Sequence, residues 1–149
     1  MIKVLKEGLF TTIQDIGRFG YKNIGVPVSG SMDQTSAKLA NLLLGNDESS
    51  AVLEMTLVGP TLEFMNDTYI SITGADMNPS LNKQKVLQNK PLFVNKGDIL
   101  YLSHSSNGMR SYLGIKGGFN SEKKLGSKSF YSCLLYTSPS PRDRTRSRM

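Results

Sequence analysis

Short apolar segments separated by turn residues dominate the pattern of this chain. Runs rich in Val, Ile, Thr, Tyr and Phe alternate with turn sequences such as Gly59-Pro60 and Asn66-Asp67. Such spacing is typical of antiparallel strands, and it predicts a mainly β fold, either a barrel or a sandwich. The predicted strands are Ile2–Leu5, Leu9–Ile13, Val52–Leu57, Thr61–Phe64, Thr68–Thr73, Leu92–Val94, Ile99–Ser103 and Arg110–Ile115.

One stretch has the period of a helix instead. Ala and Leu residues recur near helical spacing up to Leu44, which gives an apolar stripe. The residues before the stripe fit a capping box with Ser31 as the N-cap and Gln34 at N3, and Gly45 suits the position after the helix. We therefore expect one prominent capping helix, at about Met32–Leu44, that covers one end of the barrel.

The segment CLLYTSPSPRDRTRSRM at positions 133–149 breaks the pattern. It has no apolar periodicity, and it holds the only cysteine and half of the net charge of +6. One interpretation is a disordered basic arm. The other, which we favour, is that it resembles the translation of a sequencing adapter joined in frame to an interrupted gene. We therefore expect residues 1–132 to be the N-terminal part of a longer domain and residues 133–149 to be a non-native, disordered tail.

Composition argues against several classes of function. Without the tail the charge is nearly balanced, so it does not indicate nucleic acid as a partner. No apolar run is long enough to span a bilayer, and His104 is the only histidine, which argues against a zinc site. We expect a cytoplasmic chain without a metal site of its own, bound neither to nucleic acid nor to a membrane.

A glycine-rich stretch, QDIGRFGYKNIGVPVSGSMD, precedes the predicted helix. Arg18 could present its guanidinium fork to a carboxylate or a carboxyphosphate-like group, with Asp15 to orient it. The alternative is a surface ion pair at a turn. Ser29 and Gly30 lie just before the helix, where free N–H groups and the helix dipole favour an anion, whereas capping alone would account for Ser31.

Three other positions carry side chains that a site could use. Asp76 follows a predicted strand in TGAD, where the alternative is a tight turn with an exposed carboxylate. Lys116 could face a ligand, next to glycines that allow close strand packing. Glu54 could act as a general base, but we interpret it as an outward-pointing surface side chain.

Five blocks occur in order along the chain: TTIQDIGRFGYKNIGVPVSGSMD, LANLLLGN, LEMTLVGPTLEF, ITGAD and YLGIKGGF. Together they resemble the biotin-dependent carboxyltransferase family. This family includes the C subunit of 5-oxoprolinase, the KipI antagonist, allophanate hydrolase subunit 2 and the matching region of urea carboxylase. Its members are well over twice as long, so the resemblance implies a truncated, cyclophilin-like β-barrel. The substrate-binding residues it implies are Gln14, Asp15, Arg18, Ser29, Gly30 and Asp76; it assigns no catalytic residue.

Three functions follow from the resemblance. We favour a subunit of ATP-dependent 5-oxoprolinase, which opens 5-oxoproline to glutamate, with KipI-like and LamB-YcsF-like subunits that bring the ATP. The second is a urea-type carboxyltransferase domain that moves a carboxyl group from carboxybiotin to a small amide, and biotin enters only there. The third is a non-catalytic KipI antagonist. The first two act on a small amide or lactam, and we expect the fragment alone to be inactive.

Overall fold

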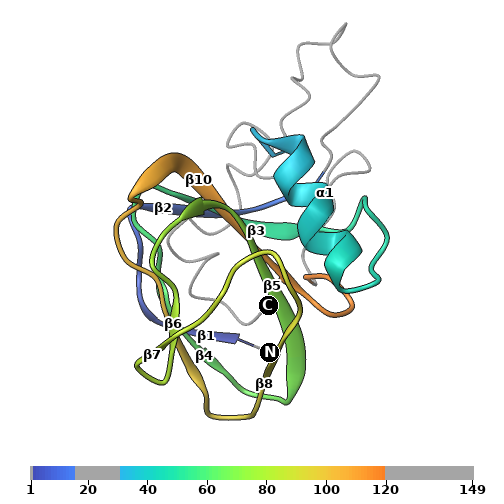
Figure 1. The fold of residues 1–149 in the computed structure, drawn as a ribbon. Coiled ribbons are helices and arrows are strands. Elements are labelled where there is room, and N and C mark those ends of the chain that lie inside the picture. Colours follow the sequence, from blue (N-terminus) through green and yellow to red (C-terminus); the bar gives the residue numbers. More distant parts are fainter. Residues whose placement is uncertain (1, 16–30, 120–149) are drawn as a thin grey trace, which may run out of the picture.

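The computed structural model describes residues 2–15 and 31–119, which form two antiparallel sheets and one helix (Figure 1). The elements are β1 (Ile2–Lys6), β2 (Phe10–Gln14), α1 (Gln34–Leu43), β3 (Val52–Thr56), β4 (Thr61–Phe64), β5 (Thr68–Asp76), β6 (Ser80–Leu81), β7 (Gln84–Lys85), β8 (Leu92–Val94), β9 (Ile99–Tyr101) and β10 (Asn107–Ile115). One sheet has the order β1-β4-β9-β6-β7, and the other has the order β2-β3-β10-β5-β8. The expected mainly β class with one helix is confirmed.

The main apolar core combines inward-facing residues of both sheets. On β3, Leu53 and Met55 are fully buried in this core, and Leu62 and Phe64 of β4 contribute from the other sheet. Side chains on a strand alternate between its two faces. The residues of β3 between these two, and next to them, therefore point to the opposite face of the β2-β3-β10-β5-β8 sheet.

Helix α1 covers that opposite face, whereas we had expected it to cover one end of a barrel. A second buried cluster joins Ala37 and Ala40 of the helix to Val52 and Tyr112 of the sheet, and Figure 1 shows the helix lying beside β3, β5 and β10. The small helix residues allow a close approach. Hydroxyl groups of β5 then donate hydrogen bonds to helix carbonyls: Ser71 Oγ to Ala40 O at 2.7 Å and Thr73 Oγ1 to Ser36 O at 2.7 Å.

The helix begins later than the sequence predicted. Its N-cap is Asp33, whose carboxylate accepts a hydrogen bond from the Ser36 N–H at 3.1 Å, so the prediction of Ser31 as the N-cap was wrong. Asp and Ser are equally good N-caps, and Gln34 does reach back, but to the carbonyl of Ser31. Gly45 follows the helix with φ +70°, as expected of a residue in that position.

Every predicted strand is present; Thr61–Phe64 and Leu92–Val94 have the predicted bounds, and the others have shifted ends. Strand β5 runs on to Asp76, and β10 begins at Asn107. The short hairpin of β6 and β7 was not predicted, because its two-residue strands are too short to show a period. It turns at Asn82 and Lys83, which both have positive φ, as a tight hairpin turn requires.

Two further predictions concern a membrane-spanning segment and the boundary at residue 132. Within residues 2–15 and 31–119, no helix is long and apolar enough to cross a membrane. The predicted boundary at residue 132 and the predicted tail at 133–149 lie outside the described residues.

Gly114 of β10 provides a test of how the helix packs on the sheet. A Cβ atom at this position would lie 2.8 Å from Ser71 Oγ and 3.1 Å from Ala40 O. We expect Gly114→Ala to lower the free energy of unfolding by about 1–3 kcal/mol, the usual cost of overpacking, as measured by urea denaturation. Lys3→Ala, on an exposed position of β1, is the control and should change it by less than about 0.5 kcal/mol. Equal values for the two variants would contradict close packing at Gly114.

Candidate functional site

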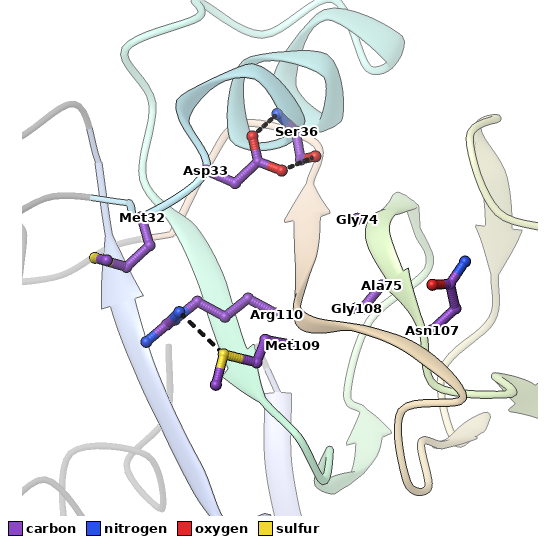
Figure 2. A pocket seen from close by; sticks show the side chains of 9 residues that line it. All are labelled: Met32, Asp33, Ser36, Gly74, Ala75, Asn107, Gly108, Met109 and Arg110. Carbon is purple, nitrogen blue, oxygen red and sulfur yellow. Dashed lines mark hydrogen bonds between the residues drawn. The ribbon is translucent and has the colours of Figure 1, made fainter.

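A pocket of about 530 Å³ opens where the start of α1 meets β5 and β10 (Figure 2). Its volume lies in the range of small-molecule sites. The lining combines small, apolar and polar residues with one cation and one anion. These residues are Met32, Asp33, Ser36, Gly74, Ala75, Asn107, Gly108, Met109 and Arg110.

An irregularity in β10 shapes this pocket. Asn107 pairs with Asp76 and Ser111 pairs with Gly74, so the stretch of β10 between these pairs is longer than the matching stretch of β5. Gly74 and Gly108 have φ of +84° and +86°, and a Cβ on Gly74 would lie 2.6 Å from Arg110 O. Such bulges bend a strand and redirect its side chains, and they are over-represented next to active sites. Here the bulge carries Met109 and Arg110 along the pocket.

A buried carboxylate, that of Glu54, lies beneath the start of the helix. Glu54 on β3 is 5% exposed, and its Oε2 accepts hydrogen bonds from the Tyr112 hydroxyl at 2.7 Å and from the Met32 N–H at 2.9 Å. Tyr112 O–H in turn accepts from the Asp33 N–H at 2.9 Å. Two main-chain donors before the helix are thus bound, directly or through one hydroxyl, to a single carboxylate.

The interpretation of Glu54 as an outward-pointing surface residue was therefore wrong. The strand alternation does place Glu54 on the face away from the main core, beside Thr12 of β2 and Tyr112 of β10. That face is covered rather than exposed: Thr12 is 3% exposed and Tyr112 is fully buried. The signal for a buried Glu54 is a polar residue opposite it on each neighbouring strand. This signal can be recognised only once the strand pairing is known.

The start of α1 has fewer free donors than the sequence suggested. Met32 N–H and Asp33 N–H are bound to Glu54 and Tyr112, and Ser36 N–H is bound to Asp33. The Asp33 carboxylate also accepts the Ser36 hydroxyl at 2.6 Å. These bonds lower the pKa of Asp33, with the Ser36 hydroxyl as the main cause. The negative charge that a helix start favours is therefore supplied by the protein's own carboxylates.

Arg110 is the cation of the pocket. Its Nε lies 3.9 Å from Glu54 Oε1, beyond hydrogen-bond distance, and this buried nitrogen has no hydrogen-bond partner among the described residues. Its side chain is 29% exposed, and the one hydrogen bond recorded for its Nη1 goes to Met109 Sδ at 3.9 Å. Figure 2 shows the two side chains extending the same way, with Asn107 on the other side of the bulge. Within residues 2–15 and 31–119, the guanidinium is held by the charge of Glu54, and the Met109 sulfur is the only hydrogen-bond acceptor found for it.

Gln14 and Asp15 lie together at the end of β2 but do not line the pocket. Both are buried, and Asp15 is joined to the helix start through its carbonyl, which accepts from Ser31 N–H at 3.0 Å. Gln14 Nε2 donates to Thr12 Oγ1 at 3.0 Å, while its Oε1 has no hydrogen-bond partner. Their role as substrate-binding residues stays a prediction. Arg18, Ser29 and Gly30 lie outside the described residues.

Asp76 and Lys116 both make hydrogen bonds within the fold. Asp76 Oδ1 accepts the N–H of Asn78 at 2.8 Å within a turn, and Asp76 does not line the pocket, although Gly74 and Ala75 beside it do. Lys116 Nζ donates to Leu44 O at 2.7 Å. This carbonyl lies at the C-terminal end of α1, where the helix dipole favours a cation. Lys116 therefore caps α1, which accounts for a side chain that the sequence had offered as a ligand contact.

No group of three or more His, Cys, Asp or Glu residues within the described ranges could hold a metal ion. His104 is exposed and forms an isolated bridge with Val58, away from the pocket lining.

Comparison with known proteins assigns the chain to a family. The family described as "Carboxyltransferase domain, subdomain A and B" matches residues 24–136. The chain belongs to the carboxyltransferase domain family. The carboxyltransferase domain match covers most of the chain, including α1, the buried Glu54 and the bulge of β10.

Individual relatives agree with this assignment. The chain is 44% identical to urea amidolyase of Lachancea kluyveri over 131 residues, which are 87% of the chain and 7% of that protein. It is 37% identical to the C subunit of Escherichia coli 5-oxoprolinase over 129 residues, which are 87% of the chain and 42% of that protein. The crystal structure of Kluyveromyces lactis urea carboxylase matches 86% of the chain and 11% of that protein, with 44% identity and a TM-score of 0.84. The chain thus spans less than half of each of these three relatives.

Tyr112 links the buried carboxylate to the helix, and its ionisation offers a pH test. Burial and the hydrogen bond to Glu54 raise the pKa of Tyr112 well above its ordinary value of 10. The neutral hydroxyl therefore stabilises the fold fully below about pH 10, and this stability is lost as the pH rises toward the folded-state pKa. We expect Tyr112→Phe to cost about 1–3 kcal/mol at pH 8, because it leaves Asp33 N–H unpaired.

Urea denaturation between pH 8 and pH 11 checks this expectation. The stability difference between the native protein and Tyr112→Phe should shrink above pH 10, by up to about 1.4 kcal/mol per pH unit. Tyr101→Phe, at a side chain that is 46% exposed, is the matched control and should show no such trend. A difference that stays constant from pH 8 to pH 11 would contradict the buried hydroxyl.

Proposed function

We propose that this chain is part of a carboxyltransferase-type subunit of a 5-oxoprolinase, which opens 5-oxoproline to glutamate at the expense of ATP. The observation that carries the proposal is the pocket beside the buried Glu54, in a chain that shares 37% identity with one subunit of a 5-oxoprolinase. Similarity to a single subunit of that enzyme implies a complex of several, and we propose KipI-like and LamB-YcsF-like proteins as the partners.

The chemistry of the pocket suits a small lactam. Asn107 offers an amide that can both donate and accept hydrogen bonds, and Arg110 supplies a positive charge that favours an anionic group on the bound molecule. The apolar surface comes from Met32, Ala75 and Met109. ATP would bind to the partner subunits, because no stretch of the sequence has the glycine-rich pattern ending in Lys-Ser or Lys-Thr that cradles nucleotide phosphates.

A second candidate is carboxyl transfer from carboxybiotin to urea. It is favoured by the higher identity, 44%, to urea amidolyase. Both candidates act on a small planar amide and develop negative charge, so one pocket suits either. The role of KipI antagonist and the cytoplasmic location remain predictions.

Two chimeric proteins separate the candidates. In one, residues 1–119 of this chain replace the aligned part of the C subunit of Escherichia coli 5-oxoprolinase; in the other, they replace the aligned part of Lachancea kluyveri urea amidolyase. When the first chimera is assayed with its partner subunits, we expect it to consume 5-oxoproline with ATP within about tenfold of the parent rate. A tenfold change in rate corresponds to about 1.4 kcal/mol in the activation free energy. We expect the second chimera to lose urea-dependent ATP hydrolysis. The reverse result, in a pair of chimeras with normal melting curves, would assign the chain to urea-type carboxyl transfer.

A further inference from the structure

The charges that line the pocket are unequal in what they can still bind. Asp33 and Arg110 are the two charged residues of the lining. Both oxygens of the Asp33 carboxylate already accept hydrogen bonds from Ser36. Figure 2 shows these bonds directed toward the helix and away from Arg110. The negative charge of the lining is therefore used within the protein.

The positive charge is not used in this way. The carboxylate of Glu54 lies 3.9 Å from Arg110 Nε, close enough for charge attraction but too far for a hydrogen bond. Among the described residues, the partner recorded for Nη1 is the weakly accepting sulfur of Met109. A guanidinium has five donors in a planar fork that matches a carboxylate. Arg110 thus keeps its strongest binding mode for a group that enters the pocket.

Glu54 itself cannot fill that mode. Its Oε2 is bound to Tyr112 and Met32, and the side chain is 6% exposed. These bonds fix the carboxylate beneath the helix start. It therefore attracts Arg110 but stays too far from Nε to accept a hydrogen bond. The other lining residues that the structure describes are uncharged, so none of them competes for the fork.

We infer that Arg110 is the carboxylate-binding residue of this pocket and that the pocket takes a small lactam or amide that carries a carboxylate, in preference to a neutral amide. The inference rests on the proposed function and deepens it: 5-oxoproline has both groups, whereas urea lacks the carboxylate. Glu54 is a positioning residue that holds Arg110 at the pocket.

Three probes test the inference by NMR titration of the full 149-residue chain labelled with ¹⁵N. They are 5-oxoproline, 2-pyrrolidinone, which is the same ring without the carboxylate, and biotin, which has a ureido ring with a carboxylate on a flexible chain. We expect 5-oxoproline to shift the amide signals of Gly74, Ala75 and Gly108, and to bind at least about tenfold tighter than 2-pyrrolidinone, as one charged hydrogen-bonded pair implies.

Variants assign the difference to Arg110. Arg110→Met should bring 5-oxoproline down to the affinity of 2-pyrrolidinone, and Arg110→Lys should fall between, because it keeps the charge but not the fork. Lys83→Met removes an equal charge from the turn between β6 and β7, away from the pocket lining, and should change neither affinity. If Arg110→Met melts early because Glu54 is left unpaired, the double variant Arg110→Met with Glu54→Gln removes both charges and serves in its place.

The inference is overturned if 5-oxoproline shifts signals elsewhere, if Arg110→Met binds it as tightly as the native chain, or if biotin binds through Arg110 while 5-oxoproline does not. These outcomes are independent of turnover by the chimeras. If the oxoprolinase chimera is active but binding does not depend on Arg110, the inference is rejected and the proposed function is kept. If binding depends on Arg110 but the chimera is inactive, the proposed function is rejected and the role of Arg110 is kept.

Discussion

A carboxylate that is only 5% exposed has to be compensated by donors, and the way Glu54 is compensated determines how the site is built. Its two hydrogen bonds come from Tyr112 and from the main chain at Met32. The first fixes the central strand β10, and the second fixes the chain just before α1. The helix start is therefore placed over the sheet by one charged group, and the pocket opens beside that junction.

The same carboxylate sets the electrostatics of the pocket. It attracts Arg110 without hydrogen bonding to it, and it takes donors at the helix start that would otherwise be open to an anion. The ability to bind an anion is thereby moved from the helix start to the guanidinium. The predicted contacts of Ser29 and Gly30 with a ligand lie outside the described residues and stay a prediction.

How much could be predicted depended on how local each signal was. Strand segments such as Thr61–Phe64 show their apolar residues within a few positions, so they were found, and Gly45 was placed correctly because a helix end has a strong local preference. The N-cap was missed by two residues because Ser31 and Asp33 have nearly equal local propensities. Packing decided between them: Ser31 is buried against the carbonyl of Asp15.

The pocket beside Glu54 depends on long-range pairing, and the sequence did not indicate it. Glu54 and Tyr112 are adjacent only through the register of β3 with β10, and Arg110 was expected only as the start of a strand. Gly108 in SNGMR carried a signal, since a glycine at a strand position is typical of a bulge. What the sequence did provide was the family: the ordered blocks indicated a carboxyltransferase domain, and the match over residues 24–136 agrees.

A double-mutant cycle with Glu54→Gln and Tyr112→Phe measures whether the buried carboxylate and the hydroxyl act together. The free energy of unfolding would be measured by urea denaturation at pH 7 for the native chain, both single variants and the double variant. We expect a coupling energy above about 1 kcal/mol, because the hydroxyl donates to a charged, buried acceptor. Additivity within about 0.5 kcal/mol would mean that the two side chains act independently, and it would contradict the role of Glu54 as the group that fixes the helix start to the sheet.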